Sequence, residues 1–205
     1  MNNAEVTKAV VKVGGGRGFI IQSGHNRLVV TAAHCLPHLP PCHGANNTDE
    51  RTYPNLFGPL GSRKPKVWAE CVCADPVGDI AVLGSPDGQV LSGEAAAYEA
   101  LTHETPTFRI GDAPRKGRAW LLSLAMHWHP CVVEHIDGPL WIEEAADGIH
   151  GGMSGSPIVT DDGTAIGIVC IGSSIGDAPQ TSGGPNPRLL HHLPGWLLQK
   201  VTTAP

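Results

Sequence analysis

The sequence predicts an all-β fold of the barrel or sandwich class. Short runs of β-branched and aliphatic residues recur at intervals of roughly 8–15 residues, and turn-forming residues separate them. Glycine and proline number 26 and 18 among the 205 residues, which suits many short strands joined by tight turns. Hydrophobic residues make up 41% of the chain, which is enough to bury a proper core.

The expected elements follow one another along the chain. An irregular loop rich in Pro, Gly, Asn and His is expected at 37–61. A helix, or a plain connection between two lobes, is expected at 93–103. A terminal helix is expected at 193–201, with Trp196 and Leu197 facing inward. The predicted strands are 6–13, 18–22, 27–31, 66–73, 79–83, 117–124, 131–136, 140–143, 156–160 and 164–171.

Charge and hydropathy exclude several function classes. The net charge is −5 and the chain has no basic run, so nothing favours nucleic acid as a partner. Aromatic residues make up only 5%, too few for base stacking. No stretch reaches the roughly 20 apolar residues of a membrane span, and the N-terminus lacks the pattern of a signal peptide. We therefore expect a cytoplasmic protein without membrane contact.

The six cysteines are expected to be free thiols, because the cytoplasm keeps thiols reduced. A structural zinc site is the alternative. The usual Cys-x₂-Cys pairs are absent, so we expect no metal site. The zinc ligands would come from Cys35, His38, Cys42, His43, Cys71 and Cys73, and a weaker cluster consists of His127, His129 and Cys131.

Three segments carry candidate chemistry, and the first is Thr31-Ala-Ala-His34-Cys35. Here a histidine follows a predicted strand and two small residues. Small residues let the backbone pack closely and direct the imidazole into a cleft. A lone histidine is more often a surface or capping residue, but the whole pentapeptide is far less common by chance.

The second segment places Asp79 after Gly78 and before the apolar run Ile80–Leu83. An aspartate at the head of an apolar strand is partly buried, and a buried carboxylate is costly unless it is paired or hydrogen-bonded. An imidazole N–H is one such partner. The alternative is a solvated turn residue, which is the commoner role of an aspartate next to glycine.

The third segment is Gly151-Gly152-Met153-Ser154-Gly155-Ser156-Pro157. Glycines on both sides allow a serine to occupy a tight turn with its hydroxyl exposed. They also free backbone N–H groups to converge on one point, as an oxyanion hole requires. The alternative is a simple loop of glycine and serine.

Together the three segments resemble the trypsin-like serine peptidase superfamily, with TAAHC for the base, DIAVL for the acid and GMSGSP for the nucleophile. The chain order of histidine, aspartate and serine is also that of the superfamily. Gly16-Arg-Gly18-Phe-Ile-Ile21 is similar to the Gly-x-Gly-Phe strand of bacterial HtrA-like (Deg-type) peptidases, although we expect no PDZ-like extension. The resemblance spans residues from about 10 to 201.

The resemblance implies a single peptidase domain over 1–205. It would consist of two six-stranded antiparallel β-barrels, the chymotrypsin- or trypsin-like fold, with a short C-terminal helix. The N-terminal barrel would occupy about 5–90, the C-terminal barrel about 105–190 and the helix about 193–201.

The resemblance also implies the role of each site residue. Ser154 would attack the scissile carbonyl, His34 would take and return the proton, and Asp79 would orient the imidazole. Gly152, Met153 and Ser154 would form the oxyanion loop, with the N–H groups of Gly152 and Ser154 as donors. The expected substrate is a protein or peptide, and the implied chemistry needs no metal or organic cofactor.

The chain departs from the family pattern at three positions. Digestive members carry an aspartate before the nucleophile that pairs with a freed N-terminal amine; Met153 cannot do this, so other contacts, a partner or the substrate must set the oxyanion loop. Ser156 replaces a glycine of the family, and Ser154 remains the expected nucleophile because it matches the family serine. Cys35 finds no cysteine within 18–22 to bridge to, so we expect a small buried thiol.

The specificity pocket is the least legible part of the site. Its floor is expected six residues before the nucleophile, at Gly148, with Asp147 beside it. A glycine floor suits small or apolar side chains, whereas an inward Asp147 would suit basic ones. The expected walls are Cys170, Ile171 and Gly172 on one side and Gly184 to Asn186 on the other.

Two functions therefore compete. The first is a bacterial serine endopeptidase that makes limited cuts in a protein, by analogy with relatives that activate an effector partner. The second is an inactive trypsin-like fold that keeps its groove and binds a peptide or protein. All three triad residue types are present, which favours the enzyme.

Overall fold

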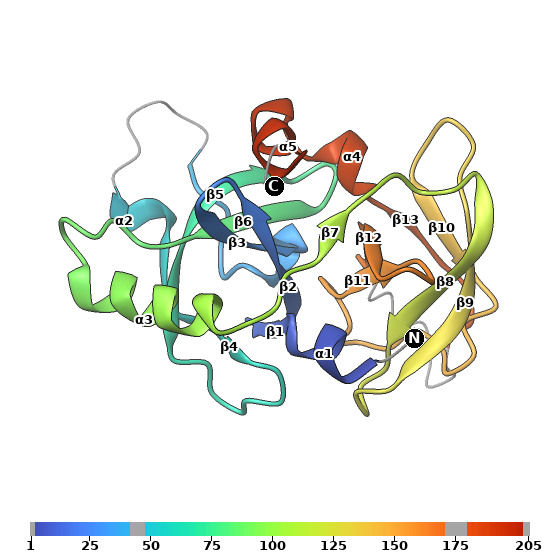
Figure 1. Ribbon diagram of the computed structural model, residues 1–205, viewed down its shortest axis with the longest axis horizontal. Helices are drawn as coiled ribbons and strands as arrows, with labels where there is room; N and C mark the ends of the chain where they lie inside the picture. The colour runs from blue at the N-terminus through green and yellow to red at the C-terminus, as the bar shows by residue number, and fades with distance from the viewer. Residues whose placement is uncertain (1–2, 42–47, 171–179, 203–205) are drawn as a thin grey trace.

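Six antiparallel strands in the N-terminal half close into a barrel, in the order β1-β2-β3-β6-β5-β4 (Figure 1). The computed structural model describes residues 3–41, 48–170 and 180–202. This barrel is the first of the two predicted. Its strands are β1 (Val10–Val13), β2 (Gly16–Ser23), β3 (Asn26–Thr31), β4 (Thr52–Pro59), β5 (Val67–Asp75) and β6 (Ile80–Gly84).

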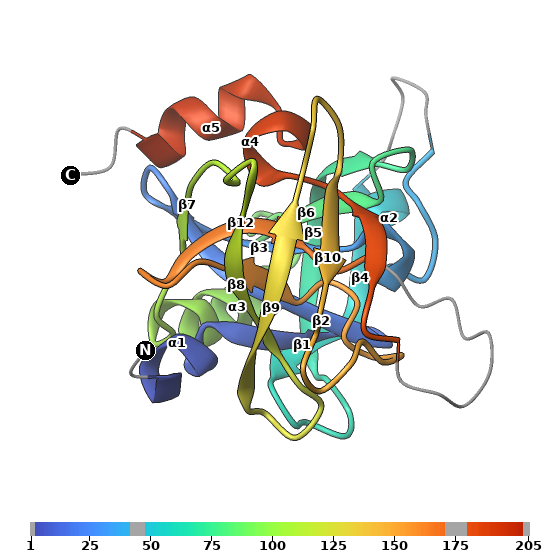
Figure 2. The ribbon, with the colours of Figure 1, turned by 90° about the vertical axis from the view of Figure 1, so that its right-hand side faces the viewer.

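The C-terminal half forms a second, strongly curved sheet of seven strands, in the order β13-β10-β9-β8-β11-β12-β7 (Figure 2). The prediction was six antiparallel strands. The seventh is the two-residue β7, which pairs parallel to β12 where the chain leaves the first barrel. The strands are β7 (Arg109–Ile110), β8 (Lys116–Leu122), β9 (Trp128–Glu134), β10 (Leu140–Glu143), β11 (Pro157–Val159), β12 (Thr164–Ile168) and β13 (Gly183–Asn186).

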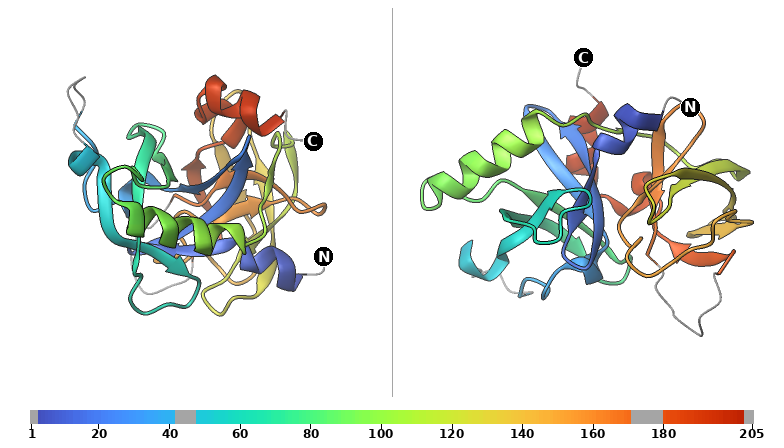
Figure 3. Two further views of the ribbon diagram at one scale, coloured as in Figure 1. Left: turned by 60° about the vertical axis from the view of Figure 1, so that its left-hand side comes forward. Right: turned by 90° about the horizontal axis from the view of Figure 1, so that it is seen from below.

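Short helices pack around the outside of the two sheets. The longest, α3, lies on the outer side of the first barrel, away from the second sheet (Figure 3). None of the helices in the described ranges is both long and apolar enough to span a membrane. The helices are α1 (Asn3–Lys8), the 3₁₀ turn η1 (Ala33–Cys35), α2 (Thr48–Arg51), α3 (Ser92–His103), α4 (Leu189–His192) and α5 (Gly195–Thr202).

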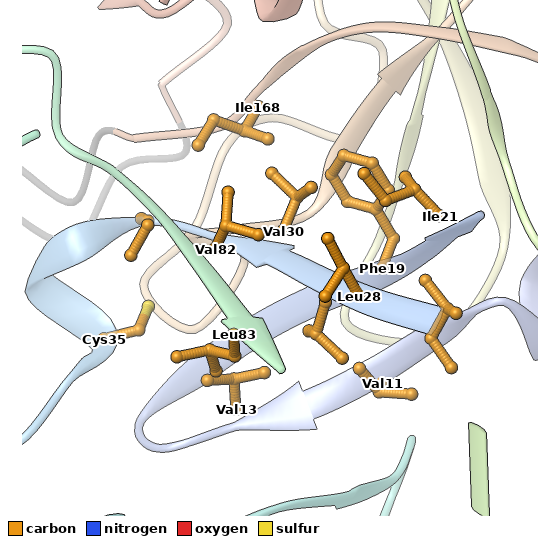
Figure 4. Packing of buried hydrophobic residues seen from close by; sticks show 14 of the residues in the cluster. Val11, Val13, Phe19, Ile21, Leu28, Val30, Cys35, Val82, Leu83 and Ile168 are labelled. Carbon is orange, nitrogen blue, oxygen red and sulfur yellow. The ribbon is translucent and has the colours of Figure 1, made fainter. Parts of the chain in front are cut away.

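Strand β2 is buried on both faces, which explains its run of apolar residues without alternation. Phe19, Ile20 and Ile21 are each 0% exposed. Phe19 packs edge-on against Phe108, with ring centroids 5.5 Å apart, and so ties the segment between the lobes to the barrel. Ile168 of β12 belongs to the same core (Figure 4). The two lobes therefore share apolar packing, and this packing fixes how they lie against each other.

Helix α3 is joined to the barrel by a buried hydroxyl. Tyr98 is 0% exposed, and its hydroxyl lies 3.0 Å from the carbonyl oxygen of Arg27 and 3.2 Å from that of Leu83. A buried tyrosine hydroxyl needs such partners. The range 93–103 is therefore a helix, and it packs against the outside of the barrel.

Three local predictions were wrong. The strand predicted at 6–13 begins only at Val10, because the residues before it form α1. The loop predicted at 37–61 contains strand β4, whose register with β5 shifts between Tyr53 and Phe57 and so hides the alternation. In α5, Leu197 faces inward as predicted, but Trp196 is 49% exposed, because adjacent residues of a helix do not share one face.

We expect Val82→Ala to lower the free energy of unfolding by about 2–3 kcal/mol, because it removes two methyl groups from a closed barrel and leaves a void. Val82 is 1% exposed, whereas Val77, in the turn before the same strand, is 96% exposed. Val77→Ala is the matched control and should change stability by less than about 0.5 kcal/mol. Urea unfolding followed by tryptophan fluorescence measures both. Equal losses would contradict the described barrel.

Candidate active site

The first barrel brings His34 and Asp79 into direct contact. His34 lies in η1, just after β3, and Asp79 lies just before β6, which pairs with β3. The Nδ1 atom of His34 is 2.7 Å from Oδ2 of Asp79, and the backbone N–H of His34 donates to Oδ1 at 3.0 Å. One carboxylate thus binds both the ring and the backbone of His34. The ring is held with Nε2 on the side away from Asp79.

The backbone around Asp79 is shaped for this contact. Asp79 has a φ of +53°, a left-handed conformation that is uncommon outside glycine but accessible to aspartate. Its carbonyl oxygen accepts the N–H of Ala33 at 3.2 Å. The same oxygen accepts the S–H of Cys170 at 3.2 Å. Burial, reinforced by the Asp79 carboxylate, raises the pKa of Cys170, so this thiol stays protonated and able to donate.

The side chains of His34 and Asp79 differ in their exposure to solvent. The side chain of His34 is 47% exposed, and that of Asp79 only 28%. The imidazole is therefore open to a ligand, while the carboxylate behind it is partly covered. A carboxylate oxygen accepts a hydrogen bond from the ring, so the contact at Nδ1 favours the ring tautomer with a proton on Nδ1.

The second lobe supplies Ser154 on a tight turn. The N–H of Met153 donates to the carbonyl of His150 at 3.1 Å and closes the turn. Gly152 has a φ of +91°, which the third position of a type II turn requires. Met153 is 0% exposed, and its sulfur accepts the N–H of His150 at 3.3 Å. The buried methionine thus anchors the turn at the position where digestive relatives use an aspartate.

The backbone of Ser154 is held between the two lobes. Its carbonyl oxygen accepts the N–H of Arg17, on β2, at 2.7 Å. On the other side, the N–H of Gly155 donates to Val169 at 2.7 Å. Gly155 has a φ of +81°, and a Cβ at that position would collide with the carbonyl of Arg17. Only glycine therefore permits this contact directly after Ser154.

Two N–H groups of this loop remain available. In the described part of the chain, the N–H groups of Gly152 and Ser154 make no hydrogen bond, whereas that of Met153 is used by the turn. Free backbone donors beside a serine are what an oxyanion hole needs. Of the three predicted residues, Gly152 and Ser154 therefore have unbonded N–H groups, whereas Met153 is buried and holds the turn in place.

His34 and Ser154 lie close but are not hydrogen-bonded to each other. The sulfur of Cys35, the neighbour of His34, is 3.7 Å from the carbonyl oxygen of Ser154. No hydrogen bond between the imidazole and the hydroxyl is found among the described residues. Catalytic hydrogen bonds are often long in ligand-free enzymes and tighten when substrate binds.

The structure separates the two competing serines. Ser156 is 0% exposed, and its Oγ is buried without a hydrogen-bond partner in the described chain. Ser154, at 6% exposure, keeps some contact with solvent. A hydroxyl sealed in the core cannot meet a substrate, so only Ser154 has the access that a nucleophile needs.

The residues predicted for the specificity pocket are only partly brought together. Gly148 is buried with a φ of +72°, and the side chain of the adjacent Asp147 is 56% exposed. Oδ2 of Asp147 lies 3.6 Å from Nδ1 of the buried His129, beyond hydrogen-bonding distance. Burial lowers the pKa of His129. Asp147 therefore does not point fully inward.

The predicted walls are described in part. The N–H of Cys170 donates to Oδ1 of Asn186 at 2.9 Å, and Nδ2 of Asn186 donates to Leu140 at 3.1 Å. Asn186 thus connects the segment that follows β12 to β10, a structural role for a side chain that is 1% exposed. Gly184 lies in β13 against the ring of Trp141. The other two predicted wall residues, Ile171 and Gly172, lie outside the described residues.

The predicted zinc alternatives find no support in the described ranges. No group of three histidine, cysteine or acidic side chains there could hold a metal ion. Two of the proposed ligands, Cys42 and His43, lie outside the described residues. The five described cysteines are free thiols, and Cys35 is buried as expected.

Arg17 is the site residue that the sequence did not single out. It appeared only as the variable position of the Gly-x-Gly-Phe segment, yet its backbone N–H binds Ser154 and its side chain crosses to the second lobe. The guanidinium donates to the carbonyls of Leu122 at 2.6 Å and Ser123 at 2.9 Å. No side-chain pattern in the sequence pointed to it, because the contact with Ser154 is made by the backbone N–H of Arg17.

Comparisons with known proteins agree with this architecture. The protease domain of MamO from Magnetospirillum magneticum, in its apo form, has a TM-score of 0.53 at 17% identity and covers 93% of this chain and 98% of that chain. Rv3671c from M. tuberculosis H37Rv, as a serine-to-alanine mutant in an inactive form, has a TM-score of 0.54 at 20% identity and covers 100% and 93%. A further inactive form of the Rv3671c protease has the same score and identity and covers 98% and 92%.

At these identities the solved structures show a shared fold. Comparison with curated proteins finds no match. The family model described as the trypsin-like peptidase domain matches residues 16–168, a range that contains His34, Asp79 and Ser154. Because this match spans most of the chain and the fold agrees with it, the chain belongs to the family of trypsin-like peptidase domains.

Proposed function

We propose that the protein is a serine endopeptidase that uses His34, Asp79 and Ser154 as a catalytic triad. The observation that carries the proposal is the pair of hydrogen bonds from His34 to the Asp79 carboxylate, at 2.7 and 3.0 Å. They hold an exposed imidazole in one orientation next to the turn that presents Ser154. A purely structural histidine would not need its ring both fixed and open to solvent.

The proposed reaction is acyl transfer through a covalent intermediate. Nε2 of His34 takes the proton of the Ser154 hydroxyl as Oγ attacks the scissile carbonyl carbon. The resulting imidazolium is stabilised by Asp79, and it then donates its proton to the leaving amine as the C–N bond breaks. Water attacks the acyl-enzyme in the same way, which releases the acid and restores Ser154.

The backbone N–H groups of Gly152 and Ser154 are the proposed oxyanion donors. Removal of one such donor typically raises the barrier by about 3–4 kcal/mol. The turn that presents them is anchored by the buried Met153 and by the glycine geometry at Gly152. This anchoring supports an oxyanion loop that forms without a freed N-terminal amine.

Endopeptidase activity is favoured because one cavity borders the proposed triad and a second borders the proposed oxyanion loop. One, of about 410 Å³, is lined by Asp79, Cys170 and Asn186 among others. The other, of about 250 Å³, includes Gly152. An extended chain that contacts both continues past the scissile bond in both directions. We propose limited cleavage of a protein substrate at an exposed loop, with an effector partner as one such substrate.

An inactive peptide-binding fold is the second candidate. It is favoured by the missing hydrogen bond between His34 and Ser154 among the described contacts. In that case the groove would bind a peptide without acylation.

Fluorophosphonate labelling separates the two candidates. Attack by Oγ forms an O–P bond and expels fluoride, so the adduct mass reports an activated serine. We expect wild type and Ser156→Ala to be labelled and Ser154→Ala to remain unlabelled. Ser156→Ala should be as stable as wild type or slightly more stable, because it removes a buried hydroxyl without a partner. Labelling of Ser154→Ala, or none of wild type, would contradict the proposal.

Asp79→Asn tests the orienting role of the carboxylate. We expect the rate of labelling to fall about 10⁴-fold, because an amide favours the wrong imidazole tautomer. Asp75→Asn is the matched control in the same turn, since its Oδ1 accepts the N–H groups of Val77 and Gly78 and an amide oxygen accepts them equally well. Its labelling rate should stay within about twofold of wild type. Circular dichroism confirms that both variants are folded. Equal rates for the two variants would remove Asp79 from the mechanism.

A further inference from the structure

A cationic cavity lies directly beside the proposed oxyanion loop. Its volume is about 250 Å³, and Gly152 forms part of its lining. Three basic side chains line it as well: Lys12 from β1, Arg17 from β2 and Arg63 from the segment between β4 and β5. No carboxylate belongs to its lining in the described chain. The concentration of positive charge contrasts with the net charge of −5 for the whole protein.

Folding alone does not account for this arrangement. Lys12 and Arg17 are direct partners across the β1–β2 hairpin, and like charges placed opposite one another destabilise a sheet. Among the described contacts, neither Lys12 nor Arg63 forms an ion pair or a side-chain hydrogen bond. The guanidinium of Arg17 is bound only to carbonyl oxygens, so its charge is not compensated by an anion.

The cavity lies on the leaving-group side of the proposed scissile bond. Ser154 is held between β2, through Arg17, and the segment that follows β12, through the Gly155 bond to Val169. Cys170, where the expected substrate wall begins, comes directly after Val169, so the acyl part of a substrate is expected there. The leaving group must then extend the other way, over Gly152 and toward β1 and β2.

Apolar side chains also line the same cavity. Leu124 and Met126, in the turn between β8 and β9, are 51% and 48% exposed. The turn lies beside the β4–β5 segment in Figures 1 and 2. An aliphatic stem can pack on these two residues while a terminal carboxylate meets the cations, as the methylene groups and carboxylate of glutamate would.

We infer that the peptidase selects an acidic side chain within the first two residues after the scissile bond, with Lys12 and Arg63 as the specificity-determining residues. The inference rests on the proposed endopeptidase function. Arg17 contributes positive charge and fixes the geometry through its bonds to the second lobe. Ion pairs at partly exposed sites discriminate by about threefold, and salt screens them.

Sequencing of new N-termini tests the inference directly. A peptide library prepared from a denatured proteome is digested with the full-length protein, and the first residues of the products report the leaving-group side. We expect aspartate and glutamate to be enriched about threefold at one of the first two positions. The enrichment should fade as sodium chloride rises from low concentration to about 0.5 M.

Charge reversal supplies the matched variants. Arg63→Glu, and Arg63→Glu combined with Lys12→Gln, should abolish the acidic preference or turn it toward lysine and arginine. Lys64→Glu changes the net charge by the same amount as Arg63→Glu at the next residue, which does not line the cavity. It should keep the wild-type preference. A preference lost equally in both single variants would reflect overall charge and would overturn the inference.

Fluorophosphonate labelling of each variant distinguishes the two levels of the argument, because the probe carries no peptide on the leaving-group side. Labelling at wild-type rates without any acidic preference in the digests would overturn the inference and leave the peptidase intact. Absence of labelling and of cleavage in wild type would overturn both.

Discussion

The hydrogen bond from the Arg17 N–H to the carbonyl oxygen of Ser154 is the contact on which the site depends. At 2.7 Å it joins a strand of the first barrel to the loop of the second sheet that presents the candidate nucleophile. The approach is possible only because Gly155 follows Ser154, since any Cβ there would meet the Arg17 carbonyl. This contact fixes the position of one lobe relative to the other at Ser154, where small displacements matter most for the proposed chemistry.

The first barrel then positions His34, the candidate base. Closure of six strands places η1 beside the turn before β6, so that one carboxylate binds both the ring and the backbone of His34. The barrel core, with its shared apolar packing against β12, resists movement that would separate His34 from Ser154. The same interface between the lobes therefore stabilises the fold and holds the geometry of the proposed active site.

Much of this could be predicted from the sequence. The strands next to His34, Asp79 and Ser154 contain β-branched residues, and the small residues around the three motifs constrain their turns. Strand β4 was missed because its proline residues and shifted register disguise the alternation. Arg17 was missed because its importance comes from a backbone contact, which no side-chain pattern records. Exposure of Trp196 was missed because adjacent residues of a helix face different sides.

The specificity elements were harder to predict for a related reason. Lys12, Arg17 and Arg63 are scattered along the sequence and converge only when two strands of the barrel pair and a distant loop folds over them. Asn186 lines the cavity beside Asp79, but it is only 1% exposed and its side-chain amide binds the backbone of Cys170 and Leu140. Chain order alone places residues near the site, whereas burial and hydrogen bonding decide whether they face it.

A crystal structure of the fluorophosphonate adduct would test the central claim most directly. We expect phosphorus bonded to Oγ of Ser154, with one phosphoryl oxygen within about 2.7–3.1 Å of the N–H groups of Gly152 and Ser154. Nε2 of His34 should lie within hydrogen-bonding distance of Oγ or of another phosphoryl oxygen. An adduct on a different residue, or a phosphoryl oxygen that points to solvent away from Gly152, would contradict the account.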